Sequence, residues 1–213
     1  MQRQGDTIFT GQNLMLALCQ SVKNVLNTAT GDSISYSPMM QKIGKTCLTP
    51  DIGTFVMFTG SMAGLVVINF PKDTAMEIYS SYMTSMGLDE KDLAANYTSD
   101  EVSDSLGELM NQIIGSFTRE MSNKLRIQLS QSQPKMLVMP QEVQININLN
   151  LDNPLYRRVT FFTGSGKVFY VELAINDTEF TLFDNIEEKQ ELSPDDILEA
   201  VLNGTDKIND WPN

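Results

Sequence analysis

The stretch "SLGELMNQIIG" occupies residues 105–115 and places its apolar residues at the spacing of an amphipathic helix. Two of its polar residues, Glu108 and Asn111, stand three positions apart and therefore lie one helical turn from each other. On a helical wheel with about 100° per residue, Gly115 falls within about 60° of Glu108, on the side opposite the apolar residues. Spacing alone favours a solvated helix face, so the meaning of the pair depends on the rest of the chain.

Helical periodicity recurs in three segments of the chain. The predicted helices cover residues 13–30, 71–86 and 99–124. Gly31 is suited to end the first helix, Pro71 to begin the second, and Ser99 or Asp100 to cap the third. The apolar stripe of the third helix consists of Leu106, Leu109, Met110, Ile113, Phe117 and Met121.

Strand patterns lie between and after these helices. Residues 55–70 and residues 159–174 each read as two apolar strands joined by a turn that contains Gly and Ser. Residues 143–151, "VQININLNL", alternate strictly and predict a half-buried strand. Its polar face carries Gln144, Asn146, Asn148 and Asn150. We expect that face to be in solvent, or alternatively to form a contact between subunits.

Two segments of the chain repeat. The string "FTGS" occurs at 58–61 and at 162–165, each time at the turn between apolar strands. Residues 20–31 align without gaps on residues 104–115, which sets Asn27 against Asn111. Chance similarity between amphipathic helices is the alternative, but the same order of helix and hairpin occurs twice. We therefore predict an α/β (α+β) domain with an internal duplication, in which two long pseudo-symmetric helices lie beside a mixed β-sheet.

Composition excludes several classes of site. The 213 residues include no histidine, which removes Ser-His-Asp and Cys-His arrangements and histidine-ligated zinc. Cys19 and Cys47 are too few for a disulfide framework. The net charge of −12 argues against nucleic acid as a partner. The N-terminus lacks an apolar signal core and no apolar run is long enough to cross a bilayer, so we expect a soluble, cytoplasmic protein without a membrane partner.

The acidity is concentrated at the C-terminal end. Residues 184–213 contain nine acidic residues and two lysines, a net charge of −7, which leaves −5 for residues 1–183. Within "LSPDDILEAVLNG", at 192–204, Ser193 is placed as an N-cap, Pro194 follows it, and Gly204 can end the helix. We predict a domain over 1–183 and an acidic tail with a short helix over 184–213.

The segment "DSLGELMNQIIGSFTREMSNKLRI", at 104–127, resembles the signature helix of the CheC/CheX/FliY family of response-regulator phosphatases. The family pattern is Glu, two residues, Asn, three residues, Gly, which fits Glu108, Asn111 and Gly115. The resemblance is closest to the CheX branch and extends over about residues 12–183. The helix at 192–204 in turn resembles the receiver-binding peptide of the flagellar switch proteins, with one residue inserted. Packing of that helix on its own domain is the alternative.

This resemblance implies an internally duplicated α/β fold and hydrolysis of the aspartyl-phosphate on a CheY-like phosphorylated response regulator, in chemotaxis or two-component signalling. Asn111 would orient the attacking water, chiefly a proximity effect. Glu108 would form a salt bridge with a lysine of the receiver. The chain itself would bind no cofactor, because the receiver supplies Mg²⁺, and CheX-like relatives are homodimers.

One catalytic site is expected in each chain. In the sequence alignment of the two helices, Asn24 stands where the second helix has Glu108, so the first helix lacks the docking carboxylate. A non-catalytic receiver-binding adaptor on the same fold is one alternative function, and a purely structural dimeric module is another. The presence of both Glu108 and Asn111 favours the phosphatase over the adaptor.

Overall fold

The computed structural model describes residues 7–182 of the chain, and one compact unit covers Ile8–Leu182. The expected acidic tail and its helix lie outside the described residues. The α-helices are α1 (Gly11–Thr30), α2 (Lys72–Ser85) and α3 (Asp100–Leu125), with a short 3-10 helix at Glu90–Asp92. The strands are β1 (Thr7–Phe9), β2 (Ser35–Lys42), β3 (Thr46–Leu48), β4 (Ile52–Gly60), β5 (Gly64–Phe70), β6 (Leu129–Gln131), β7 (Lys135–Val138), β8 (Ile145–Ile147), β9 (Pro154–Phe162), β10 (Val168–Asn176) and β11 (Phe180–Leu182).

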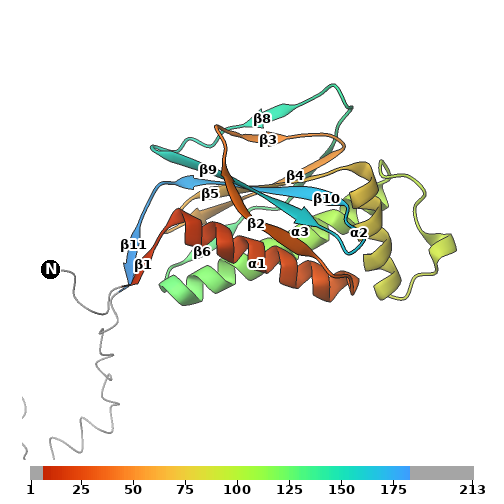
Figure 1. Ribbon diagram of the computed structural model, residues 1–213, viewed down its shortest axis with the longest axis horizontal. Coiled ribbons are helices and arrows are strands. Elements are labelled where there is room, and N and C mark those ends of the chain that lie inside the picture. The colour runs from red at the N-terminus through yellow and green to blue at the C-terminus, as the bar shows by residue number, and fades with distance from the viewer. Residues whose placement is uncertain (1–6, 183–213) are drawn as a thin grey trace, which may run out of the picture. The chain divides into compact units, whose positions relative to one another are not determined.

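A seven-stranded sheet forms the centre of this unit. Its strand order is β2-β9-β10-β5-β4-β6, and β7 also pairs with β4. The helices α1 and α3 lie side by side along one face, and the strand pair β3-β8 covers part of the other face (Figure 1). Every residue of β5 is buried, because this central strand is covered on both faces. The predicted fold class, helices beside a multi-stranded sheet, is confirmed. Each pairing in the sheet is antiparallel, however, so the mixed strand directions that we expected do not occur among these pairs.

The strand order has the two-fold arrangement expected of a duplication. The hairpins β4-β5 and β9-β10 meet through β5 and β10. The strand that follows each long helix pairs with the hairpin of the other half, since β2 pairs with β9 and β6 pairs with β4. Both FTGS turns contact the connection that follows a long helix: the Ser61 N–H donates to the Gln128 carbonyl at 3.0 Å, and the Gly164 N–H donates to the Asp32 carboxylate at 3.2 Å. The predicted pair of equivalent helices and hairpins is therefore confirmed.

The structure aligns the two helices in a different register from the sequence comparison. Both helices end on a left-handed residue, Gly31 (φ 68°) after α1 and Arg126 (φ 52°) after α3. Matching these ends superposes buried residues throughout: Leu14, Leu18, Val22 and Leu26 on Leu109, Ile113, Phe117 and Met121. The sequence alignment is displaced from this register by eleven residues, about three turns, which keeps the apolar face in phase. Asn111 consequently corresponds to Leu16 and not to Asn27.

Most predicted elements are present, with small shifts at their ends. Both hairpins occur, and α1 begins two residues before the predicted start. Pro71 is the N-cap residue of α2, so it precedes the helix. The predicted strand over 143–151 is largely wrong, since only β8, Ile145–Ile147, is a strand. Extended pairing stops there because β8 pairs only with the three-residue strand β3, away from the main sheet.

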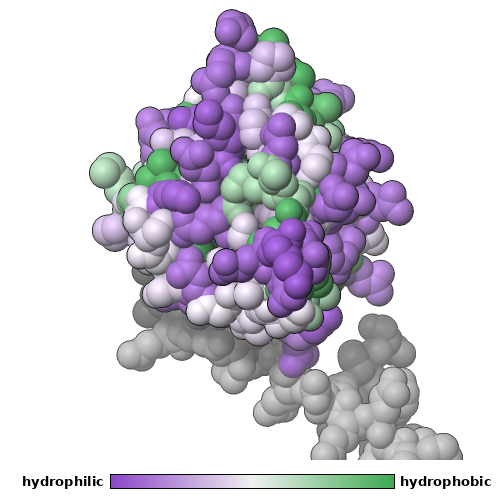
Figure 2. All heavy atoms as spheres, turned by 90° about the vertical axis from the view of Figure 1, so that its right-hand side faces the viewer, coloured by the Kyte–Doolittle hydropathy of each residue, from purple (hydrophilic) through white to green (hydrophobic). Residues whose placement is uncertain are grey.

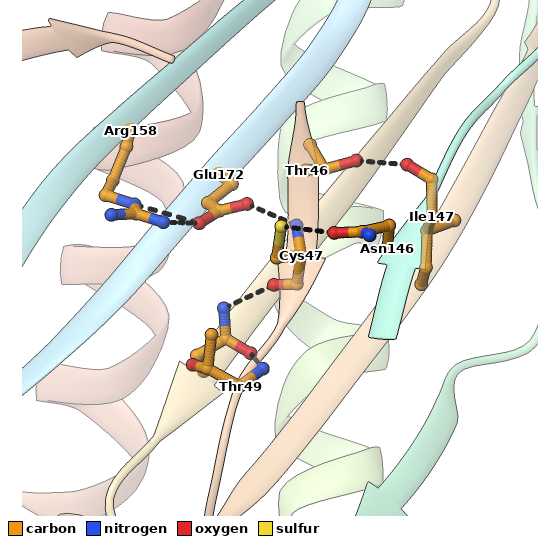
Figure 3. Close-up of polar contacts among 8 residues, drawn as sticks. Thr46, Cys47, Thr49, Asn146, Ile147, Arg158 and Glu172 are labelled. Atoms are coloured by element: carbon orange, nitrogen blue, oxygen red, sulfur yellow. Dashed lines mark hydrogen bonds and ion pairs between the residues drawn. The ribbon is translucent and has the colours of Figure 1, made fainter. Parts of the chain in front are cut away.

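The buried carboxylate of Glu172 connects the β3-β8 layer to the sheet (Figure 3). Glu172 on β10 has an exposure of 0% and receives two hydrogen bonds from the Arg158 guanidinium, at 2.8 and 2.5 Å. Its other oxygen accepts from the Cys47 N–H at 2.9 Å, and the Cys47 thiol lies 3.1 Å from the Asn146 side-chain oxygen. Asn146 therefore contacts the next strand and is not merely part of a solvated face. At the end of the unit near α2, hydrophobic residues are scattered among hydrophilic ones (Figure 2).

Candidate functional site

The helix α3 separates a buried face from an exposed one. All six residues of the predicted apolar stripe are buried, as periodicity required. Glu108 and Asn111 are exposed, and Gly115 is half-buried one turn beyond Asn111. The structure thus brings the three residues of the motif together along one exposed strip of α3, as a straight helix requires.

A groove of about 660 Å³ follows this strip. It is lined by Glu108, Asn111, Gln112, Gly115, Ser116, Arg119, Glu120, Asn123 and Gln131. Eight of these nine residues belong to α3, and Gln131 comes from the end of β6. The groove is therefore an elongated surface along one helix, with one wall contributed by the sheet.

Amide side chains hold both residues of the predicted pair. The Gln112 Nε2 donates to the Glu108 Oε1 at 3.1 Å. The Gln131 Nε2 donates to the Asn111 Oδ1 at 3.3 Å. One side-chain oxygen of each of these two residues therefore accepts a hydrogen bond from a neutral donor before any partner is bound.

Gly115 keeps the middle of the groove open. A Cβ atom built there would lie 3.9 Å from the Gln131 Oε1, and no other group lies within 4 Å outside the immediate helix backbone. Because glycine has no side chain, the backbone of α3 is bare beside the Asn111 amide. This arrangement allows a partner to approach the helix closely at that point.

Three charged residues line the groove. Glu108 lies toward the start of α3, and Arg119 and Glu120 lie about three turns further along the helix. Within residues 7–182, the Arg119 guanidinium forms no ion pair. A helical wheel would have found Arg119, because it stands four residues after Gly115. Gln131 carried no such signal.

A profile of the family described as "Protein of unknown function (DUF3334)" matches residues 5–211. The chain belongs to the DUF3334 family. No curated protein matches this DUF3334 member. Solved structures do, and they include chemotaxis proteins.

Three of these structures illustrate the likeness of the DUF3334 chain. A chemotaxis protein CheX from Desulfovibrio desulfuricans has a TM-score of 0.62 at 18% identity, covering 76% of this chain and 99% of that one. A CheX–CheY–BeF3–Mg²⁺ complex from Borrelia burgdorferi gives 0.56 at 15% identity, covering 76% and 97%. FliY from Thermotoga maritima gives 0.53 at 19% identity, covering 75% and 84%. The fold is therefore of the CheC/CheX type, as the resemblance predicted.

On α1 of this DUF3334 chain, the asparagines of the sequence alignment have structural roles. The Asn27 Oδ1 accepts from the Ile34 N–H at 2.7 Å and so holds the connection from α1 to β2. The Asn24 Oδ1 accepts from the Gln20 Nε2 at 2.8 Å. Neither residue lies beside a glutamate in the way that Asn111 lies beside Glu108.

The described part of the chain offers little other chemistry of the usual kinds. No group of three or more His, Cys, Asp or Glu side chains within residues 7–182 is placed to hold a metal ion. Burial raises the pKa of the Cys19 thiol to about 12, which keeps it protonated and unreactive near neutral pH. Cys47 is also buried. Among the described helices, none is both long and apolar enough to cross a membrane.

Proposed function

We propose that this protein is a CheX-like phosphatase that hydrolyses the aspartyl-phosphate of a CheY-like receiver domain. The observation that carries the proposal is the exposed Glu108–Asn111–Gly115 strip, which borders one groove on a CheC/CheX-type fold. One structure of similar fold is a complex of CheX with CheY, BeF3 and Mg²⁺. We expect the protein to act in the cytoplasm, where such receivers occur, and to form a homodimer.

The reaction requires few catalytic groups from the phosphatase itself. A phosphoaspartate is an activated acyl phosphate, and the receiver supplies the Mg²⁺ that neutralises charge on the phosphoryl oxygens. Water attacks phosphorus, the bond from phosphorus to the aspartyl oxygen breaks, and inorganic phosphate and the free carboxylate result. Asn111 has no basic group, so its role is to hold the water in line with that bond.

Glu108 has a separate role in docking. As an exposed carboxylate one turn before Asn111, it is suited to a charge-assisted hydrogen bond with a lysine beside the phosphorylation site of the receiver. That contact requires Glu108 to exchange its hydrogen bond with Gln112 for a stronger one. Glu108 therefore sets where α3 docks, and Asn111 acts at the phosphoryl group.

The experiment measures decay of phosphorylated CheY-like receivers with the wild type, Asn111→Ala, Glu108→Ala and the control Asn148→Ala. Asn148 is an exposed asparagine outside the groove. We expect Asn111→Ala to abolish acceleration while binding to the receiver is retained. Glu108→Ala should weaken binding and turnover together, since losing one partner of a close interfacial charge pair costs about 2–5 kcal/mol.

The control variant should match the wild type. An active wild type with equally active Asn111→Ala would exclude the assigned role of Asn111. A wild type that binds a phosphorylated receiver without accelerating its decay would instead establish the adaptor alternative. Failure to bind any receiver of the source organism would refute both.

A further inference from the structure

Gln131 joins the groove from a separate, rigid element. It is the last residue of β6, and its backbone pairs with Phe58 of β4 within the main sheet. Its side chain reaches α3, where the Nε2 donates to the Asn111 Oδ1 at 3.3 Å. The Gln131 Oε1 lies 3.9 Å from the point where a Cβ of Gly115 would stand. One side chain therefore contacts Asn111 and also lies beside the bare backbone of Gly115.

The contact restricts the Asn111 side chain. An exposed asparagine samples several rotamers and both orientations of its amide plane, and ordering it on binding costs conformational entropy. The hydrogen bond from Gln131 occupies one lone pair of Oδ1. The second lone pair and the two N–H donors of Asn111 are left for water or a partner. Because β6 is anchored in the sheet, the donor itself is held in position.

We propose that Gln131 is a positioning residue, which fixes the orientation of the Asn111 amide before the receiver docks. This inference rests on the proposed function, since it assigns a second residue to the same reaction. Gln131 orders the Asn111 amide, which holds the attacking water, already in the free protein, so this entropy cost does not add to the barrier of the reaction. Its removal should therefore lower kcat and leave KM nearly unchanged, because docking depends on Glu108 and the surface around it.

The expected size follows from the kind of contact. A neutral hydrogen bond at an exposed site contributes about 0.5–1.5 kcal/mol, which corresponds to a loss of roughly twofold to tenfold in kcat. Gln131→Ala and Gln131→Met both remove the donor, and Met retains the length of the side chain. Gln131→Glu should cost more than either, because a carboxylate can only accept and would turn the Asn111 amide around to donate to it.

Two measurements on the full chain test the inference. The first is the kcat and KM for a phosphorylated receiver on which the wild type acts, with Gln133→Ala as the matched control for an exposed glutamine two residues further on. The second uses the free protein and records the NMR signals of the Asn111 side-chain amide. Those signals should shift in Gln131→Ala and Gln131→Met, and they should be unchanged in Gln133→Ala.

Each outcome separates this inference from the proposed function. A wild type inactive on every receiver refutes the proposed function, and the inference falls with it. An active wild type with Gln131→Ala and Gln131→Met at the wild-type kcat overturns the inference alone. So do unchanged Asn111 amide signals in both variants, a rise in KM without a fall in kcat, or Gln131→Ala that is faster than the wild type.

Discussion

Substituting Gly115 by alanine should make the protein more stable and less active. Gly115 lies in the interior of α3, where glycine is about 1 kcal/mol less favourable than alanine. The added Cβ would lie 3.9 Å from the Gln131 Oε1, an ordinary van der Waals distance, so no clash offsets the gain. For a domain of this size, about 1 kcal/mol raises the melting temperature by about 2–4 °C.

The loss of activity has a different cause. The new methyl group would stand in the middle of the groove, where the proposed partner has to approach the backbone of α3 beside Asn111. A displacement of about 1 Å between reacting groups can lower the rate by about a hundredfold. We therefore expect kcat/KM for the phosphorylated receiver to fall by about 10-fold to 100-fold in Gly115→Ala.

The same helix provides a matched control. Gly107 also lies inside α3, and a Cβ there would meet only the Met136 Cγ, at 3.8 Å. It does not line the groove. Gly107→Ala should raise the melting temperature by a similar amount and keep kcat/KM within about twofold of the wild type. A destabilised Gly115→Ala, or equal activities of the two variants, would refute the reasoning.

Three other predictions concern stability and the tail. Arg158→Met leaves the buried Glu172 carboxylate unpaired and should lower the free energy of unfolding in urea by about 3–5 kcal/mol, and a cost below 1 kcal/mol would contradict this. Burial would raise the pKa of Glu77, but hydrogen bonds from Lys167 and Ser165 outweigh it and lower the pKa. The stability that the Glu77 carboxylate contributes should therefore be fully present above its ordinary pKa of 4.5 and should decline as pH falls below that value. When the free energy of unfolding is measured against pH, Glu77→Gln should lack this part of the decline. A chain that ends at Phe183 should have a higher KM for the receiver and an unchanged kcat if the acidic tail recruits it, and a lower melting temperature with unchanged KM would contradict this.

The sequence predicted those parts of the site that depend on local geometry. Glu108, Asn111 and Gly115 share one strip because helical periodicity alone places residues three, four and seven positions apart on the same side. Gln131 could not be found in this way, because its contact with Asn111 exists only after β6 has paired with β4. That pairing joins residues more than 60 positions apart, and no local pattern predicts it.

The helix register was misread for a related reason. A shift of eleven residues rotates an α-helix by about three whole turns, so the apolar positions coincide in both registers and sequence cannot choose between them. The ends of the helices decide the register, because the turn after each helix must deliver the following strand to the opposite hairpin. The repeated FTGS string located both turns, but it is displaced by one residue from the strand register, since Gln131 pairs with Phe58 and its counterpart Tyr36 pairs with Phe161.

The structural register also shows that, within residues 7–182, α1 lacks the groove residues that α3 carries. On α1, Asn13 stands where α3 has Glu108, and its side chain accepts from the Thr10 N–H at 2.8 Å, which caps the helix. Leu16 replaces Asn111 and is 54% exposed, so it offers no polar group to a water molecule.

Gln20 of α1 replaces Gly115, and Tyr36 on β2 replaces Gln131. The Tyr36 hydroxyl lies 3.5 Å from the Gln20 Oε1, so these two side chains cover the helix at the point where α3 is bare. The counterparts of the two positions that leave α3 accessible thus contact each other, one on α1 and one on β2. A receiver that docked on α3 as proposed, through a carboxylate, an amide and an open backbone, would find none of the three on α1, so we expect one site in each chain.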